Sequence, residues 1–358
     1  MADMVQNTKS SFMNFLVIGL GSAGQRHLRV LTKFFGTNAN IYVYKGDHKR
    51  GLISDDLSNE NFSINPIEYY KATELYTTTE LLEQTWELVI IATPPDSHYF
   101  YAEKLITNSK RILIEKPLTI NSLDAYKILN FAEVNDVPVL VGYQMVFHPF
   151  MVFIKKNMNN IGEIKSCTTD FTEKLSSMNP FRSMESHYLS KPTGGGAFLS
   201  LSHDLDFLLK IFNQTFANDI FFTGVKFLNN GSLAECTLNC KVQVEENKLN
   251  ILSKFSILPG ATCRTGQIQG SKAVIEWDLM RGIIELKDLG GESKNRLICT
   301  VDKDELFRSQ LENILRLDNY DEYCQSNLGR AKFIVEANTK LHNKKFNEPF
   351  VSDDNQVK

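Results

Sequence analysis

The sequence lacks an excess of charge of either sign, a long apolar run and a paired cysteine motif. Its 39 Lys and Arg residues nearly balance 42 Asp and Glu residues, giving a formal net charge of -3, which argues against a general attraction to nucleic acid or to anionic membranes. The six cysteines are scattered without a Cys-x-x-Cys pair, so we expect reduced thiols and neither a zinc site nor a disulfide framework. The first apolar run, residues 15–20, is too short for a signal segment or a membrane span. We therefore expect a cytoplasmic protein.

A chain of 358 residues with 42% apolar and 23% charged residues is long enough for two globular domains. In residues 1–146, short apolar runs at 15–18, 41–44, 88–92, 112–114 and 137–141 alternate with amphipathic stretches such as 25–35 and 123–134. Strands that alternate with helices in this way predict a doubly wound parallel sheet, that is, an α/β Rossmann domain.

The pattern changes over residues 147–358. One apolar helix is expected at 197–212, mostly strand-like segments from 220 to 300, and two helices at 304–316 and 329–343. Strands that follow one another without long helices predict a large, mostly antiparallel open sheet. We therefore expect an α+β domain for substrate binding and oligomerisation, with a C-terminal helix that can return to the Rossmann domain.

A glycine-rich turn directly follows the first predicted strand. Gly19, Gly21 and Gly24 stand in the spacing GxGxxG ahead of a predicted helix. The first glycine permits a tight turn, the second leaves room for a pyrophosphate, and the third lets the helix pack closely on the strand. Phosphate oxygens then meet free backbone N–H groups at the positive end of the helix. We predict dinucleotide contacts along the whole turn, which comprises Gly19, Leu20, Gly21, Ser22, Ala23 and Gly24.

The end of the second predicted strand bears on which dinucleotide is used. An acidic residue about 20 positions beyond the glycine turn accepts the ribose 2′-hydroxyl of NAD, whereas this chain has Lys45 there, followed by His48, Lys49 and Arg50. Cationic side chains suit a 2′-phosphate. NADP(H) is therefore favoured, NAD(H) remains possible, and Lys45 and Arg50 are predicted cofactor contacts. The alternative is a solvated turn that happens to be basic.

Three further segments carry reactive side chains. Residues 91–98 and 113–118 each end a predicted strand, and ligands bind at the carboxyl ends of strands in an open α/β sheet. The third segment, residues 194–206, places three glycines ahead of a helix. The side chains of interest are Thr93, Pro94 and His98, then Glu115 and Lys116, then Ser200, His203, Asp204 and Asp206.

In their order along the chain, these motifs resemble the family of glucose–fructose oxidoreductase, inositol dehydrogenase and rhizopine catabolism proteins, called Gfo/Idh/MocA. The markers are the GxGxxG followed by Arg-His, the Thr-Pro-Pro-x-x-His turn, Glu-Lys-Pro, Val-Gly-Tyr-Gln with Phe-His-Pro, the glycine triplet before His-Asp-Leu-Asp, and segment 268–278. They extend from Phe15 to about Lys340. The His-Asp-Leu-Asp segment is similar to that of relatives linked to surface-polysaccharide sugar biosynthesis. Relatives often pair the open faces of their C-terminal sheets, so the resemblance implies a homodimer or a homotetramer.

The resemblance also implies a role for each matching residue. Lys116 would lie beside the nicotinamide, and His203 would carry the proton. The other implied cofactor contacts are Thr93, Pro94, His98, Glu115 and Gln144, with Tyr143 meeting the substrate near the nicotinamide end. The chemistry agrees, because hydride transfer leaves a proton to be handled, and a desolvated lysine or a histidine titrates in a suitable range.

Two positions depart from the family pattern, Ser200 and Val146, the latter standing where a relative carries Arg before Phe-His-Pro. Many relatives carry an aspartate where Ser200 stands, and a serine cannot orient a cation by charge. Either Asp204 or Asp206 compensates for it, or the proton relay is weaker, and we place Asp206 among the predicted substrate contacts. No further donor cluster at useful spacing supports a metal beside His203.

The loop before the glycine triplet should overhang this site. Arg182, His187 and Lys191 lie in it and are candidates for contacts to sugar hydroxyls or to a phosphate. The alternative is a solvated polar loop.

The sequence therefore predicts an NAD(P)-dependent oxidoreductase that transfers a hydride between the nicotinamide and a hydroxyl or ketone carbon of a sugar, nucleotide-sugar or sugar acid. The alternative is a catalytically weak or inactive dinucleotide-binding protein, acting as a sensor or an assembly partner. Ser200 favours that alternative, whereas Lys116 and His203 disfavour it. Methyltransferases that use S-adenosylmethionine also have a glycine-rich first turn, but the Glu-Lys-Pro strand end and Lys45 give them no support.

Overall fold

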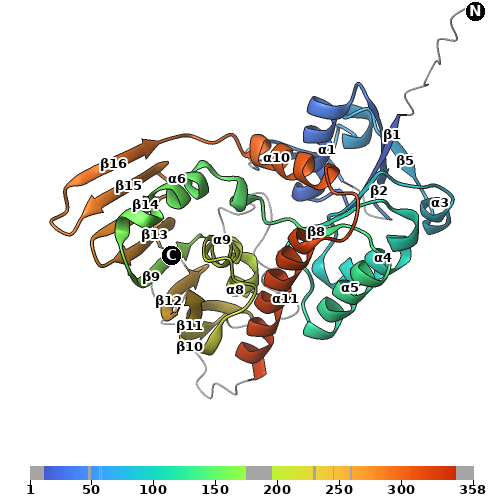
Figure 1. The fold of residues 1–358 in the computed structure, drawn as a ribbon. Helices are drawn as coiled ribbons and strands as arrows, with labels where there is room; N and C mark the ends of the chain where they lie inside the picture. The colour runs from blue at the N-terminus through green and yellow to red at the C-terminus, as the bar shows by residue number, and fades with distance from the viewer. Residues whose placement is uncertain are drawn as a thin grey trace, which may run out of the picture.

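The protein was analysed as a computed structural model, which describes residues 12–46, 50–55, 57, 59–174, 196–228, 231–244, 246–258 and 260–343. Two large sheets organise these residues, one in each half of the chain (Figure 1). The first has six parallel strands in the order β5-β2-β1-β6-β7-β8. The second has eight strands in the order β10-β11-β12-β9-β13-β14-β15-β16. The predicted fold class is confirmed.

The six parallel strands are short, and all except the edge strand β5 are largely apolar. They are β1 (Met13–Ile18), β2 (Ala39–Tyr44), β5 (Thr73–Leu75), β6 (Leu88–Ile91), β7 (Ile112–Ile114) and β8 (Val139–Val141). Every residue of β6 and β7 is buried, as expected where helices cover both faces of a parallel sheet. Helix α1 (Ser22–Phe35) packs on one face, and α4 (His98–Leu105) and α5 (Ser122–Val134) pack on the other.

Several small elements of this half have no apolar pattern and were not predicted. The edge strand β5 reads Thr-Glu-Leu, too short and too polar to stand out. The others are β3 (Leu52–Ile53), β4 (Glu60–Asn61), α2 (Pro66–Tyr69), α3 (Thr78–Leu82), and the 3₁₀ turns η1 (Pro95–Ser97) and η2 (Ile106–Asn108).

The second sheet is antiparallel except where β12 and β9 run parallel. Its strands are β9 (Ile164–Thr172), β10 (Asn218–Phe227), β11 (Leu233–Val244), β12 (Asn247–Ser256), β13 (Cys263–Gly270), β14 (Ala273–Asp278), β15 (Ile283–Asp288) and β16 (Ser293–Ile298). The elements η3 (Gln144–Phe147), α6 (Pro149–Asn157) and η4 (Met158–Ile161) lead into it. Phe198 packs edge-on against Phe222 and Phe255 of the sheet.

The predicted continuous helix at 197–212 is wrong. The structure has α8 (Gly196–Ser200) and α9 (His203–Ile211) as separate helices, with Leu201 and Ser202 between them. The hydroxyl of Ser202 donates a hydrogen bond of 2.8 Å to the carbonyl of Leu199. A serine that bonds to nearby backbone in this way competes with regular helix geometry, and the break lets His203 begin a new helix.

The two helices that close the chain pack back on the first half (Figure 1). Helix α10 (Lys303–Leu315) lies against α1, where Asp304 and Arg29 form an ion pair of 2.7 Å. Helix α11 (Glu322–Asn343) lies along α5 and β8, and its Asn327 side chain accepts a 2.7 Å hydrogen bond from the backbone N–H of Val141. Among the described residues, no helix has both the length and the apolar character that crossing a membrane requires.

Candidate active site

The turn between β1 and α1 fits a bound pyrophosphate. A Cβ on Gly19 would lie 2.5 Å from the carbonyl oxygen of Ala92, and one on Gly24 would lie 2.0 Å from that of Gly19. A Cβ on Gly21 would meet no atom within 4 Å. The first and third glycines therefore serve close packing within the protein, whereas the second leaves open space outside it. Because no side chain caps the start of α1, its first N–H groups remain available to an anion.

The predicted adenosine end of the site contains an ion pair. Lys45, directly after β2, pairs with Glu74 of the neighbouring strand β5, and both side chains are more than two-thirds buried. The cation predicted to favour a 2′-phosphate is thus already partnered by a carboxylate. Arg50 is partly buried, while His48 and Lys49 lie outside the described residues.

The structure does not place His98 as a cofactor contact, because the side chain is 1% exposed. Its Nδ1 lies 3.0 Å from the carbonyl oxygen of Pro117 and 3.1 Å from that of Leu118, and its Nε2 lies 3.0 Å from that of Thr93. Both ring nitrogens therefore face backbone, and His98 braces the ends of β6 and β7. Thr93 is partly exposed and Pro94 is exposed at the same edge.

Glu115 is likewise buried and bonded within the protein. Its carboxylate accepts a hydrogen bond of 2.8 Å from Nε2 of His27 in α1, and the residue is 8% exposed. Burial alone would raise the pKa of Glu115, but the hydrogen bond and charge of His27, together with the charge of Lys116, lower it overall. A buried anion held by α1 therefore immediately precedes Lys116.

The side chain of Lys116 crosses to the second half of the chain. Its Nζ donates a hydrogen bond of 2.7 Å to the carbonyl oxygen of Ser200, at the end of α8. Burial lowers the pKa of this ammonium group; the carboxylates of Glu115 and Glu173 oppose that effect, and the guanidinium of Arg264 adds to it. The hydroxyl of Ser200 is buried and has no hydrogen-bond partner within the described part of the chain.

His203 begins α9 close to Lys116. Burial, followed by the positive charges of Lys116 and Arg264, holds the pKa of His203 well below its ordinary value, so its imidazole is neutral. Its Nδ1 is buried and finds no hydrogen-bond partner among the described residues. An orphaned polar atom of this kind, beside a lysine, is consistent with a site completed by a ligand.

The ring of Tyr143 supports His203. The two rings meet edge to face, with centroids 5.7 Å apart at 90°. Tyr143 is 1% exposed, and its hydroxyl lies 3.4 Å from Oγ of Ser202. Tyr143 therefore packs against His203, and its contact to substrate stays a prediction. Gln144, the next residue, is partly exposed at the start of η3.

The two aspartates of α9 have separate arginine partners. Asp204 pairs with Arg264 of β13, with Nε to Oδ2 and Nη2 to Oδ1 distances of 3.4 Å each. Asp206, fully buried, pairs at 2.7 Å with Arg330 of α11, which is 1% exposed. The carboxylate of Asp206 is thus enclosed between two helices, with Oδ2 lacking a hydrogen-bond partner among the described residues, and its contact to substrate stays a prediction. Neither arginine lies in a motif that sequence analysis identifies.

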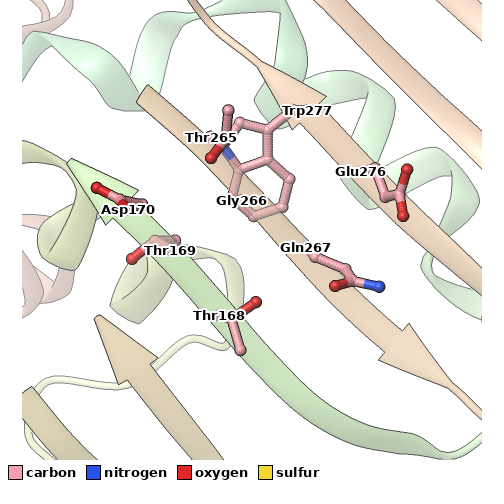
Figure 2. Close-up of a pocket in the computed structure, with 8 residues that line it drawn as sticks. All are labelled: Thr168, Thr169, Asp170, Thr265, Gly266, Gln267, Glu276 and Trp277. Carbon is pink, nitrogen blue, oxygen red and sulfur yellow. The ribbon is translucent and has the colours of Figure 1, made fainter. Parts of the chain in front are cut away.

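Three predicted substrate contacts, Arg182, His187 and Lys191, lie outside the described residues. An open pocket of about 380 Å³ is found elsewhere, over the middle of the second sheet (Figure 2). Its lining comprises Thr168, Thr169, Asp170, Thr265, Gly266, Gln267, Glu276 and Trp277 of β9, β13 and β14. None of these residues belongs to the loops that carry Lys116 and His203, so we do not assign the pocket to the reaction. No group of three or more His, Cys, Asp or Glu side chains converges as a metal site within the described ranges.

Comparison with known proteins supports an oxidoreductase. Residues 13–143 match the family model described as GFO_IDH_MocA, oxidoreductase family, NAD-binding Rossmann fold. An uncharacterised oxidoreductase of Synechocystis sp. is 28% identical over 208 residues, which are 57% of this chain and 53% of that protein. The match to this curated relative thus spans only about half of its length.

Two solved structures share the fold across both halves. UDP-N-acetylglucosamine 3-dehydrogenase GnnA from Acidithiobacillus ferrooxidans superposes with a TM-score of 0.69 at 15% identity, over 92% of this chain and 96% of that one. Biliverdin reductase from Synechocystis sp., in complex with biliverdin and NADP+, superposes with a TM-score of 0.68 at 14% identity, over 91% and 96%. Residues 13–143 thus match the Gfo/Idh/MocA oxidoreductase family model, and the two solved structures show that the fold is shared across both halves of the chain.

Proposed function

We propose that this protein transfers a hydride between a nicotinamide cofactor and a hydroxyl or ketone carbon of a sugar, nucleotide-sugar or sugar acid. The observation that carries the proposal is the meeting of Lys116 with the segment that bears His203, through the 2.7 Å bond from Nζ to the carbonyl of Ser200. This contact joins the carboxyl end of a Rossmann strand, where ligands bind, to the helix that carries a neutral histidine. GnnA, which shares the fold, is named as a dehydrogenase of a nucleotide-sugar.

The two residues divide the handling of the proton between them. When bound, the nicotinamide supplies or accepts the hydride. His203, neutral because burial and neighbouring cations lower its pKa, can accept the proton of a substrate hydroxyl as a general base. In the reductive direction the protonated His203 returns the proton to the same oxygen. The Lys116 ammonium stabilises the negative charge that develops on that oxygen in both directions.

For the cofactor, we propose NADP(H) with NAD(H) as a second substrate. The basic residues at the end of β2 support NADP(H), and the neighbour crystallised with NADP+ agrees. The Lys45–Glu74 ion pair supports use of both, because Glu74 provides a carboxylate beside the lysine. The chain is also proposed to form a homodimer or homotetramer through the open face of its second sheet, which light scattering on the purified protein would test.

Titration of NADPH and NADH by nicotinamide fluorescence, followed by turnover assays, tests the proposal. Lys116→Met should lower turnover by about 100-fold or more and change cofactor affinity far less than turnover, because the glycine turn is untouched. Lys127→Met, at an exposed lysine of α5, is the matched control and should behave as wild type. Failure to bind either dinucleotide, or full turnover by Lys116→Met, would contradict the proposal.

A dinucleotide-binding protein with little turnover is the second candidate. It is favoured by Ser200, whose buried hydroxyl offers no charge to Lys116. Tight NADPH binding by the wild type, with no oxidation of it across sugars, nucleotide-sugars and sugar acids, would support this candidate.

A further inference from the structure

Arg264 lies at the centre of the site, although it belongs to no motif identified in the sequence. Its guanidinium pairs with Asp204, next to His203 in the chain. It also lowers the pKa of His203, Lys116 and Lys303 through its charge, after the effect of their burial. One strand residue is thus in electrostatic contact with both proposed reactive groups.

The guanidinium is held in a fixed orientation. Its carbon lies 4.4 Å from the centroid of the Phe171 ring, an arrangement in which a cation is attracted to the aromatic face. Nε and Nη2 point to the two carboxylate oxygens of Asp204. Nη1, with its two N–H groups, has no hydrogen-bond partner within the described part of the chain, and the side chain is 19% exposed. Arg264 is therefore pre-oriented, with one donor nitrogen left over.

The pairing with Asp204 leaves positive charge on Arg264 available to another anion. Both distances, at 3.4 Å, exceed the 2.7–2.9 Å that is typical of strong charge-assisted hydrogen bonds. Burial also raises the pKa of Asp204, against the opposing influence of Arg264. The long contacts to Asp204 therefore orient the guanidinium and leave it able to take a second, closer anionic partner.

The groups around Arg264 on the side of Lys116 and His203 are mainly cationic. Lys116 and Lys303 both sense the charge of Arg264, and within the described ranges neither lysine comes within 4 Å of a carboxylate as an ion pair. The carboxylates nearby are Asp204, Glu173 and Glu115. The last of these is bonded to His27, whereas Arg26 adds a further positive charge near Lys303.

We propose that Arg264 binds an oxyanion group of the substrate, a carboxylate or a phosphate, and so selects an acidic sugar derivative over a neutral sugar. The inference rests on the proposed function, since it names the class of substrate for the same site. A planar guanidinium matches the two oxygens of either group, and Nη1 provides the donors. Arg264 would hold the charged end of the substrate while Lys116 and His203 act at the reacting carbon.

Calorimetry on the full chain with saturating NADPH tests this, because bound cofactor blocks the dinucleotide site. The probes are UDP against uridine for a phosphate, and D-glucuronate against D-glucose for a carboxylate. At least one charged probe should bind tenfold or more tightly than its neutral counterpart, and Arg264→Gln should remove that preference by about tenfold or more. The charged probe that binds identifies the oxyanion.

Two further variants keep the test decisive. Arg281→Gln, at an arginine whose side chain is 79% exposed, is the matched control and should bind as wild type. Because Arg264→Gln leaves the buried Asp204 without its partner, the double variant Arg264→Gln/Asp204→Asn removes both charges and should show the same loss of preference with a better-folded protein. The inference would be overturned if the wild type bound charged and neutral probes equally. It would also be overturned if both Arg264 variants kept the preference for the charged probe. Cofactor binding would remain intact in either case. Absence of NADPH binding would instead overturn the proposed function.

Discussion

Removal of the Arg330 guanidinium is expected to destabilise the protein strongly. Arg330 and Asp206 have side chains that are 2% and 0% exposed, with 2.7 Å between Nε and Oδ1, and Nη1 of Arg330 also donates to the carbonyl and hydroxyl of Ser326. In Arg330→Met the carboxylate remains buried without its cation. Breaking a buried ion pair from one side costs about 3–5 kcal/mol, measurable as a loss in the free energy of unfolding in urea.

The pH dependence of this loss has a definite sign. Burial raises the pKa of Asp206 and Arg330 opposes it, so the pKa in the variant rises further. The native variant then binds more protons than its unfolded chain, whose aspartate titrates near 3.9, and stability falls as pH rises between those two pKa values. The loss caused by Arg330→Met should therefore be larger at pH 8 than at pH 5.

Two comparisons identify the cause of that loss. Arg308→Met removes an arginine from a half-exposed helical pair with Glu312 and should change stability little, because such pairs are screened by solvent. The double variant Arg330→Met/Asp206→Leu removes both buried charges and should recover much of the stability. If Arg330→Met were no less stable than Arg308→Met, or if Asp206→Asn raised the KM for substrate without a change in stability, the assignment of Asp206 to structure would be refuted.

Three other predictions concern the cofactor and the proton. Glu74→Gln should raise the affinity for NADPH relative to NADH about tenfold, because it frees Lys45 and removes a charge that repels a 2′-phosphate. Fluorescence titration measures the ratio of the two affinities. An unchanged ratio would show that the Lys45–Glu74 ion pair does not influence the choice of cofactor. Gly21→Ala should weaken binding of both dinucleotides without loss of stability, since its Cβ meets only open space; an unchanged affinity would place the pyrophosphate elsewhere. Ser200→Asp should raise the pKa of Lys116, because a carboxylate beside the ammonium favours its charged form, and should shift the pH profile of kcat/KM to higher pH. An unshifted profile would exclude Lys116 from the titration that the profile reports.

Much of the fold is predictable because its signals are local. The strands β1, β6 and β7 are apolar at nearly every position since helices cover both faces of the sheet, and the glycine spacing after β1 follows from the packing of α1 on the strand. Edge strand β5 was not predicted, because an edge position tolerates a polar Thr-Glu-Leu sequence. The break between α8 and α9 was not predicted either, since it depends on one serine hydroxyl.

The candidate site is less predictable because its contacts join distant parts of the chain. Residues 124 positions apart form the Asp206–Arg330 pair, and no helical spacing indicates it. Because the sequence does not reveal this ion pair, Asp206 was predicted to contact substrate. Arg264 was overlooked because a lone arginine in a strand carries no motif. Its importance arises only when β13 faces α9 in the folded domain.

The loop that carries Lys116 shows why buried polar residues accompany a reactive one. On its N-terminal side, Glu115 is held by His27 of α1; on its C-terminal side, the carbonyls of Pro117 and Leu118 face the buried ring of His98. Each buried polar group would cost free energy without a partner, and together they fix the backbone on both sides of one lysine. A long flexible side chain that starts from a fixed backbone reaches Ser200 with less loss of conformational freedom. The two buried imidazoles therefore contribute to the site by fixing the backbone that positions Lys116.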